Sequence, residues 1–358
     1  MKITFFISAL SGGGAERVTC NLANYMAEQG HQVEILTMAE REPADSLKDT
    51  VKHVPLLTNK EYKNKIINNV KRVLRLRKYM KSQKVDAYVV MLPKTTELML
   101  RFRKLTKSKI IVSERVDPKT YNKKTQKTLQ KLSSRANGYV FQTDEIASWY
   151  APYLKGVESR VIPNAINPAF IRKEFAGERE KKIVAVGRLA EQKNFPLLIK
   201  AFSKISDKFL DYKLVFYGKG GLQNQLEQLA LDLGVKERLE FCGFCEDMPE
   251  RLERASMFVL SSDYEGMPNA LMEAMAVGVP CVSTDCGGGG ARFLIEDGEN
   301  GILVPVGDED KLSQAIEKIL GDRELANKLS KNGRKLQEKL SPSKIYGKWE
   351  EFIKKICE

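Results

Sequence analysis

The segment SMFVLSSDYEGMPNALMEAMAVGVPCVST, residues 256–284, predicts one βαβ unit. Its first apolar run ends in small polar residues, and Pro268 stands where the first turn of a helix favours proline. Gly278 marks the expected end of that helix, and a second apolar run starts at Val279. A strand, loop, helix and strand in succession form a unit that binds ligands at the carboxyl ends of its strands.

Two glutamates of this segment, Glu265 and Glu273, have seven residues between them. Surface helices often carry such pairs, so the spacing alone indicates little. In a βαβ unit, however, the free backbone N–H groups at the start of the helix favour a phosphate. A carboxylate further along the helix is suited to accept hydrogen bonds from both hydroxyls of a ribose. The segment therefore indicates a nucleotide pocket with an additional acid beside it.

Strand-like apolar runs alternate with amphipathic segments of helix length along the chain. In the first half we expect strands at 2–8, 32–38, 86–92, 109–113, 138–143 and 159–163. In the second half we expect strands at 182–187, 213–218, 239–242, 257–262, 281–285 and 302–305. This alternation predicts an α/β protein with two doubly wound, Rossmann-like domains that face each other across a cleft.

The Pro- and Asn-containing stretch 162–170 is the expected linker. We assign residues 1–168 to an N-terminal domain, 169–342 to a nucleotide-binding C-terminal domain, and 343–358 to an amphipathic helix that packs back on the first domain. At 358 residues the chain is long enough for two hydrophobic cores. We find no apolar run suited to a secretory signal or a membrane helix and expect a cytoplasmic protein.

Six cysteines are scattered through apolar segments. Cys242 and Cys245 match the C-x-x-C pattern of redox and zinc sites. The only histidines, His31 and His53, are far away in sequence, and a second well-spaced cysteine pair is missing. Buried free thiols are the favoured interpretation, and we predict no metal site.

The formal net charge of +13 comes from the first half, where residues 1–170 contain 30 basic and 15 acidic side chains. The segment 63–84 predicts a basic helix whose apolar face contains Ile66, Ile67, Val70, Val73, Leu74 and Met80. Its candidate membrane or acceptor contacts are Lys71, Arg72, Arg75 and Lys78, and Arg101, Arg103, Lys104 and Lys107 extend the patch. A solvated surface explains this pattern equally well; the functional alternative is an anionic membrane leaflet or a lipid pyrophosphate.

Three more strand ends carry groups suited to a nucleotide. The segment LSGGGAER, 10–17, has three consecutive glycines before a predicted helix, although a tight turn explains it as well. In VGRLAEQKNF, 186–195, Arg188 and Lys193 suit a diphosphate, since arginine binds two oxygens and lysine acts as a point charge. The turn YGKGG, 217–221, is able to lie under a phosphate or a sugar.

Together these elements resemble the family 4 retaining glycosyltransferases, which have the two-domain GT-B fold. The matching motifs are Gly12-Gly13-Gly14-Ala15-Glu16-Arg17, Gly187-Arg188 with Lys193-Asn194, Gly218-Lys219-Gly220, Phe241-Cys242-Gly243, and Glu265-Gly-Met-Pro-Asn through Glu273-Ala-Met-Ala. The resemblance covers nearly the whole chain, with the motifs in the expected order. Within the family, the chain looks most like enzymes that extend polyprenyl-pyrophosphate-linked glycans for surface polysaccharides or glycoproteins.

The resemblance implies a role for each motif. Glu265 would face the transferred sugar, and Arg188 and Lys193 would neutralise the leaving diphosphate. An oxygen of that diphosphate would take the proton of the acceptor hydroxyl on the retained face of the sugar. The residues implied in donor binding are Gly13, Gly14, Arg17, Gly218, Gly220, Phe241, Gly243, Gly266, Met267, Pro268, Asn269, Ala270 and, on the ribose, Glu273. It also implies a UDP-sugar donor of the hexose or N-acetylhexosamine type, no metal or other cofactor, and a lipid-linked acceptor reached from the inner face of the membrane.

The chain departs from the family pattern in two places. Many relatives have a histidine after the fourth strand of the first domain, where this chain reads Val112-Ser113-Glu114-Arg115. Glu114 and Arg115 are therefore the candidate acceptor contacts at that place. Many relatives also have Gly-Gly-x-x-Glu after the last core strand, where this chain has four glycines, 287–290, followed by Ala291 and Arg292.

Other functions stay open. A related transferase acting on another glycolipid or a soluble acceptor fits the same motifs. A basic protein that binds nucleic acid or a membrane surface without transferase activity fits the pI of about 9.3. We expect no nucleic-acid partner, because no recognised nucleic-acid module is evident. The glutamate spacing argues against a related epimerase, and the missing lysine-bound cofactor motif argues against a phosphorylase.

Overall fold

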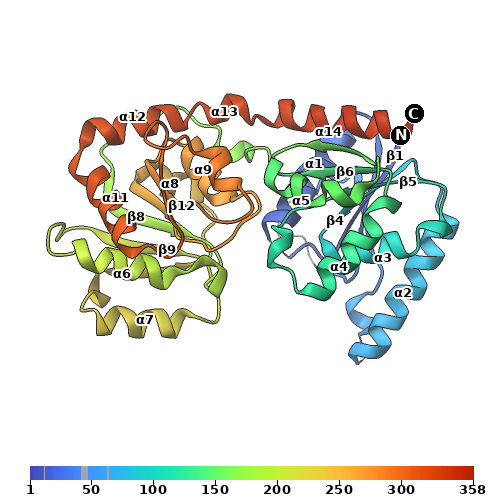
Figure 1. Cartoon of the computed structure of the whole chain (residues 1–358), viewed down its shortest axis with the longest axis horizontal. Helices are drawn as coiled ribbons and strands as arrows, with labels where there is room; N and C mark the ends of the chain where they lie inside the picture. Colours follow the sequence, from blue (N-terminus) through green and yellow to red (C-terminus); the bar gives the residue numbers. More distant parts are fainter. Residues whose placement is uncertain (12, 42–46, 63) are drawn as a thin grey trace. The chain divides into compact units, whose positions relative to one another are not determined.

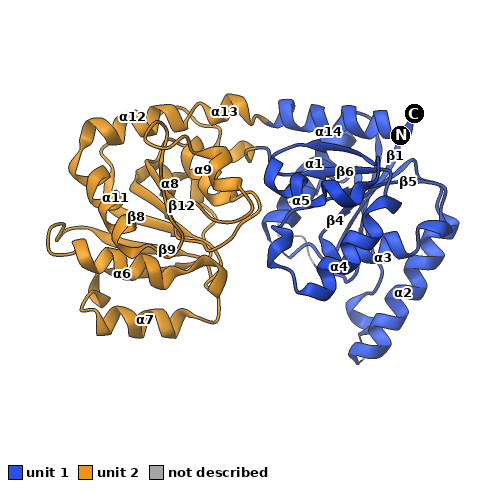
Figure 2. Cartoon of the chain, viewed as in Figure 1, with its two compact units in different colours: residues 1–165, 342–358 blue, residues 166–341 orange. Residues whose placement is uncertain are grey.

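The computed structural model describes residues 1–11, 13–41, 47–62 and 64–358. The chain divides into two compact units (Figure 2). Unit 1 contains Met1–Ala165 together with Pro342–Glu358, and unit 2 contains Ile166–Ser341. The C-terminal segment therefore belongs to unit 1, and the chain passes into unit 2 within the predicted linker. No helix of the described residues is long and apolar enough to cross a membrane.

Unit 1 is built on a parallel sheet with the order β3-β2-β1-β4-β5-β6-β7. The strands are β1 (Lys2–Ile7), β2 (Gln32–Thr37), β3 (Val51–Pro55), β4 (Ala87–Met91), β5 (Lys109–Ser113), β6 (Gly138–Phe141) and β7 (Glu158–Val161). In register, Phe5 of β1 lies opposite Ile35 of β2 and Val89 of β4, and all three side chains are fully buried. The edge strand β3 was not among the predicted strands.

The helices of unit 1 are α1 (Gly14–Glu28), α2 (Lys65–Ser82), α3 (Pro93–Arg101), α4 (Lys123–Leu132), α5 (Asp144–Leu154) and α14 (Pro342–Cys357). The helix α14 contacts α1 and β5 (Figure 1). Its apolar side chains repeat at helical spacing, and Trp349 and Phe352 are almost completely buried. Burial of this large apolar area holds α14 on unit 1, although α14 lies far from the other elements of that unit in the sequence.

Unit 2 repeats this plan with the parallel order β10-β9-β8-β11-β12-β13. Its strands are β8 (Glu180–Val186), β9 (Lys213–Tyr217), β10 (Leu239–Gly243), β11 (Ala255–Leu260), β12 (Cys281–Thr284) and β13 (Ile302–Val304). Its helices are α6 (Phe195–Ile205), α7 (Gln223–Asp232), α8 (Met248–Arg254), α9 (Asn269–Ala276), α10 (Gly290–Leu294), α11 (Glu309–Gly321), α12 (Arg323–Gly333) and α13 (Leu336–Lys339). Figure 1 shows α6 on one face of the sheet and α9 on the other, so the predicted doubly wound architecture is confirmed.

We predict that Trp349→Ala lowers the free energy of unfolding by about 3–5 kcal/mol, because it leaves a large cavity beneath α14. Urea denaturation measures the loss. The exposed neighbour Lys348 supplies the control Lys348→Ala, for which we expect a change below about 0.5 kcal/mol. A loss below about 1 kcal/mol for Trp349→Ala would contradict the packing of α14 on unit 1.

Candidate active site

The candidate site of unit 2 lies where the strand order changes direction. Strand β8 has β9 on one side and β11 on the other. The chain adds strands outward from β8 first toward β10 and then, beginning with β11, toward β13. In open α/β sheets, the crevice outside the carboxyl ends of such a pair receives the ligand. The loop after β8 carries Arg188 and Lys193, and the loop after β11 carries Glu265. The topology therefore brings these three predicted residues to one edge of the sheet.

Lys193 and Glu265 form an ion pair between the two loops. Nζ of Lys193 donates to Oε1 of Glu265 at 2.6 Å, and Oγ of Ser262 donates to the same oxygen at 2.8 Å. Oε2 of Glu265 has a longer contact of 3.4 Å with Nε2 of Gln192. Only 16% of the Lys193 side chain and 11% of the Glu265 side chain are exposed. The pair fixes the carboxylate and leaves its second oxygen with the weaker partner.

Further hydrogen bonds join the same two loops. Asn194, at a φ of 42°, caps α6, and its Nδ2 donates to Oδ1 of Asp263 at 2.7 Å. The backbone N–H of Asp263 donates to the carbonyl of Gln192 at 2.9 Å, and Oγ of Ser261 donates to the carbonyl of Lys193 at 2.8 Å. We did not predict the roles of Asp263 and Ser261. The polar run directly after an apolar strand was the available signal.

Arg188 stands apart from this network. Its side chain is exposed at the carboxyl end of β8 and has no hydrogen-bond or ion-pair partner among the described residues. The guanidinium carries a permanent charge and a fork of donors that matches two oxygens of a phosphate. A charged side chain of this kind at a topological switch point is suited to an anionic ligand.

Close backbone packing holds the neighbouring loops together. Gly218, at a φ of 137°, donates its N–H to the carbonyl of Gly243 at 2.7 Å. A Cβ on Gly218 would lie 2.0 Å from the carbonyl oxygen of Gly187, and one on Gly220 would lie 2.2 Å from that of Leu189. No side chain fits at either position. The predicted glycines therefore let the loops after β8, β9 and β10 meet.

Glu273 lies on α9 and is 4% exposed. Pro268 is the N-cap of this helix, one position before the predicted first turn, and Gly278 follows its end at a φ of 82°. The start of α10 approaches this region closely, because a Cβ on Gly290 would lie 2.0 Å from the carbonyl oxygen of Gly266. The donor-binding candidates 266–268 thus form a loop that is packed against α10, and Asn269 and Ala270 begin α9.

The end of β10 differs in part from the prediction. Phe241, a candidate for the base, is half-buried and stacks on Phe216 with 5.0 Å between ring centroids. The neighbouring thiols are free, but Cys242 is exposed and Cys245 is half-buried. The expectation of buried thiols is therefore wrong for these two cysteines, because Cys242 lies on the edge strand β10 and Cys245 lies in the segment that follows it.

The glycine run after β12 packs on the Glu265 loop through a backbone hydrogen bond from Glu265 N–H to the carbonyl of Gly287 at 3.0 Å. The neighbouring Cys286 is buried, which raises the pKa of its thiol to about 12. Arg292 binds both carboxylate oxygens of Asp285 at 2.9 Å. Its charge is therefore already paired within unit 2.

In unit 1 the glycine turn after β1 is partly filled by the chain itself. Oε2 of Glu16 accepts hydrogen bonds from the N–H groups of Gly13 at 2.6 Å and Ser11 at 2.9 Å. Gly14 and Arg17 belong to the first turn of α1. A phosphate at this helix start would compete with the Glu16 carboxylate, which the glycine pattern alone does not indicate.

Glu114 and Arg115 lie inside unit 1, 3% and 6% exposed. The carboxylate of Glu114 accepts hydrogen bonds from the hydroxyls of Tyr121 at 2.8 Å and Tyr150 at 2.5 Å, and burial raises its pKa. Arg115 donates to Asn164, and burial lowers its pKa to about 10. We predicted that both residues contact an acceptor, whereas the structure encloses them in an internal polar network.

The four basic candidates on α2 fall into two kinds. Nε of Arg72 donates to a backbone carbonyl after β2 at 2.8 Å, and Arg75 donates to both oxygens of Glu61 at 2.7 and 2.5 Å. The Arg75 guanidinium holds the pKa of the Glu61 carboxyl well below its usual range. Lys78 is exposed and Lys71 is half-buried. Arg72 and Arg75 thus attach α2 to its own unit.

The apolar face predicted for α2 is only partly buried. Leu76 and Met80 are in the core, whereas Ile66, Val70 and Leu74 are 76%, 53% and 57% exposed. The helical spacing correctly indicates an amphipathic helix, but the first three turns carry their apolar side chains outside the core of unit 1.

Comparison with known proteins agrees with this geometry. The family model described as Glycosyltransferase Family 4 matches residues 12–170, and the one described as Glycosyl transferases group 1 matches residues 167–336. The two matches follow one another along the chain and correspond to units 1 and 2. The chain belongs to the family 4 glycosyltransferases with the GT-B fold.

Similar proteins include the Campylobacter jejuni GalNAc-alpha-(1->4)-GalNAc-alpha-(1->3)-diNAcBac-PP-undecaprenol alpha-1,4-N-acetyl-D-galactosaminyltransferase, 28% identical over 99% of both chains. The lipopolysaccharide core biosynthesis glycosyltransferase LpsE of Rhizobium meliloti is 28% identical over 93% of both chains. Among solved structures, sucrose-phosphate synthase from Thermosynechococcus elongatus has a TM-score of 0.87 at 19% identity over 99% of this chain and 98% of that one. Anabaena HepE, solved with UDP, has a TM-score of 0.81 at 17% identity over 99% and 100%. At these identities the structures establish the fold.

We predict that Lys193→Ala lowers the free energy of unfolding by about 1–3 kcal/mol, because it leaves the buried Glu265 carboxylate without its cation. Arg188→Ala is the matched control at the same strand end. Its side chain has no partner among the described residues, so we expect a change within about 0.5 kcal/mol. Equal losses in the two variants, measured by urea denaturation, would contradict the ion pair.

Proposed function

We propose that this protein transfers a sugar from a UDP-sugar to a polyprenyl-diphosphate-linked glycan, with retention of the anomeric configuration. The observation that carries the proposal is the exposed, unpaired Arg188 at the switch point of unit 2, beside the loop that fixes Glu265. The similar Campylobacter enzyme is named for transfer to an undecaprenyl-diphosphate glycan, and the HepE structure contains UDP. The first name supports the proposed acceptor class, and the second supports UDP as the nucleotide of the donor.

Departure of the nucleotide is the step for which Arg188 is suited. As the bond between the anomeric carbon and the diphosphate oxygen breaks, the diphosphate gains negative charge, which a positioned cation stabilises. The acceptor hydroxyl forms the new bond to the same carbon, and its proton passes to the departing diphosphate oxygen. Entry and departure on one face of the sugar retain its configuration. Lys193 adds positive charge nearby while it holds Glu265.

Glu265 and Glu273 have different proposed partners. Oε2 of Glu265 has only a 3.4 Å contact with Gln192, so it is the oxygen suited to accept from a hydroxyl of the transferred sugar. Glu273 lies further along the same βαβ unit, on α9, where it is suited to the ribose diol. We propose that the reaction uses no metal ion, because Arg188, Lys193 and the backbone N–H groups before α9 supply the positive charge.

The acceptor class leads us to propose that the protein works at the cytoplasmic face of a membrane. On α2, Ile66, Val70 and Leu74 are exposed on a helix that also carries Lys71 and Lys78. Amphipathic helices of this kind lie in the membrane interface, with apolar side chains among the acyl chains and lysines near anionic headgroups. Unit 1 would then reach the membrane through α2.

The reaction is tested by mixing the protein with UDP-sugars and a polyprenyl-diphosphate glycan and following UDP release and product anomer by NMR. Arg188→Ala should lower kcat about 100- to 1000-fold, because one stabilising cation is lost. Glu265→Gln should lower kcat more than it weakens UDP binding, whereas Glu273→Ala should chiefly weaken UDP binding. Equal loss of UDP affinity in the two glutamate variants, or an inverted product, would contradict the proposed roles.

Membrane attachment is tested by flotation with anionic vesicles. Replacing Ile66, Val70 and Leu74 with serine should lower vesicle affinity at least tenfold, because burial of each side chain is worth on the order of 1 kcal/mol or more. A control variant replaces Leu210, Leu231 and Val306 of unit 2, which are also exposed. The same loss in both variants would show that α2 has no special part in attachment.

A further inference from the structure

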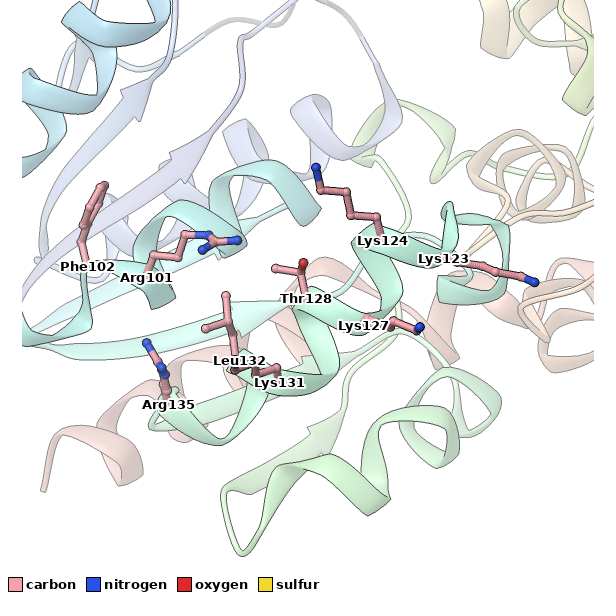
Figure 3. A pocket seen from close by; sticks show the side chains of 9 residues that line it. All are labelled: Arg101, Phe102, Lys123, Lys124, Lys127, Thr128, Lys131, Leu132 and Arg135. Atoms are coloured by element: carbon pink, nitrogen blue, oxygen red, sulfur yellow. The ribbon is translucent and has the colours of Figure 1, made fainter.

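A basic hollow of about 840 Å³ lies between α3 and α4 of unit 1 (Figure 3). Its lining residues are Arg101, Phe102, Lys123, Lys124, Lys127, Thr128, Lys131, Leu132 and Arg135. Arg101 ends α3, four lysines come from α4, and Arg135 belongs to the short turn Ser133–Arg135 that follows α4. Among the residues that the structure describes, the lining thus contains six cationic side chains and no acidic one.

The charge of this hollow is poorly compensated by the protein. Arg101 pairs with Glu97, one turn earlier on α3, at 2.7 Å. Among the described residues, no carboxylate lies within ion-pair distance of the other five cations, which are all exposed. Figure 3 shows the Arg101 guanidinium directed toward the α4 side of the hollow, where Thr128 adds a hydroxyl. Positive charge therefore borders a polar depression, although the amines of Lys123 and Lys127 extend away from Arg101 in Figure 3.

The order of residues along α4 makes this arrangement unfavourable for an isolated helix. Lys123, Lys127, Lys131 and Arg135 recur every four residues, and like charges at this spacing weaken a helix. Lys123 and Lys124 also occupy the first turn, where the helix dipole is already positive and no acidic residue is present. An anion bound in the hollow would offset both effects at once.

We propose that this hollow is a second phosphate-binding site, separate from the candidate active site of unit 2. The number of cations suits a ligand with more than one negative charge, such as a diphosphate or neighbouring phospholipid headgroups. Phe102 is the one aromatic lining residue, and Arg77 of α2 lies over its ring at 5.6 Å, so the hollow offers no free stacking platform for bases. The same contact links the hollow to α2. This proposal concerns binding alone and does not depend on transferase activity.

The test compares two triple variants of the full chain with equal loss of charge. One replaces Lys123, Lys127 and Lys131 with glutamine, and the control replaces the exposed Lys236, Lys318 and Lys331 of unit 2 with glutamine. A third variant carries Lys123→Arg, Lys127→Arg and Lys131→Arg, which keeps the charge and should keep binding. The probes are inorganic pyrophosphate, followed by calorimetry, and vesicles of phosphatidylcholine with or without phosphatidylglycerol.

We expect the α4 glutamine variant to lose affinity by about fivefold per lysine, or on the order of a hundredfold in total, relative to the control. Loss confined to phosphatidylglycerol vesicles identifies lipid headgroups as the source of the phosphate, and loss with pyrophosphate identifies a diphosphate group. Pyrophosphate bound at Arg188 is common to both variants and cancels in the comparison. Equal behaviour of the α4 variant and the control with both probes would overturn the proposal.

Discussion

The ion pair between Lys193 and Glu265 is the interaction on which the candidate active site depends. It joins the loop after β8 to the loop after β11, and the hydrogen bond from Asn194 to Asp263 supports the same junction. Because the pair is largely buried, both loops are held in one arrangement before any ligand arrives. Preorganised charge of this kind is what stabilises a departing anion with little rearrangement at the moment of reaction.

The βαβ topology sets where this junction can form. Parallel strands place their carboxyl ends at one edge, and the strand order reverses between β8 and β11, which is where open α/β sheets receive their ligands. Gly218 and Gly290 then permit backbone approaches that any Cβ would block. Arg188 remains exposed beside the paired lysine. The two cations thus have different roles: Lys193 joins the two loops, and Arg188 is available to a ligand.

The sequence predicted the alternation of strands and helices well, because periodicity and turn residues are local signals. It also placed Arg188, Lys193 and Glu265 at strand ends of one domain. It did not reveal that Lys193 pairs with Glu265, that Glu16 occupies the glycine turn, or that Glu114 and Arg115 are enclosed. These contacts join residues whose proximity is decided by packing. For α2, the helical period showed an apolar face but not that its first turns lie outside the core.

Nucleotide binding in the presence of EDTA tests the central claim most directly. The account predicts that UDP raises the melting temperature of the protein, whereas GDP and ADP do not. A ligand at a hundredfold excess over its Kd stabilises a protein by about 2.7 kcal/mol, which corresponds to a shift of a few degrees. The shift should be lost in Arg188→Ala and Glu273→Ala. An unchanged melting temperature with every nucleotide, or a shift that requires a divalent metal, would contradict the account.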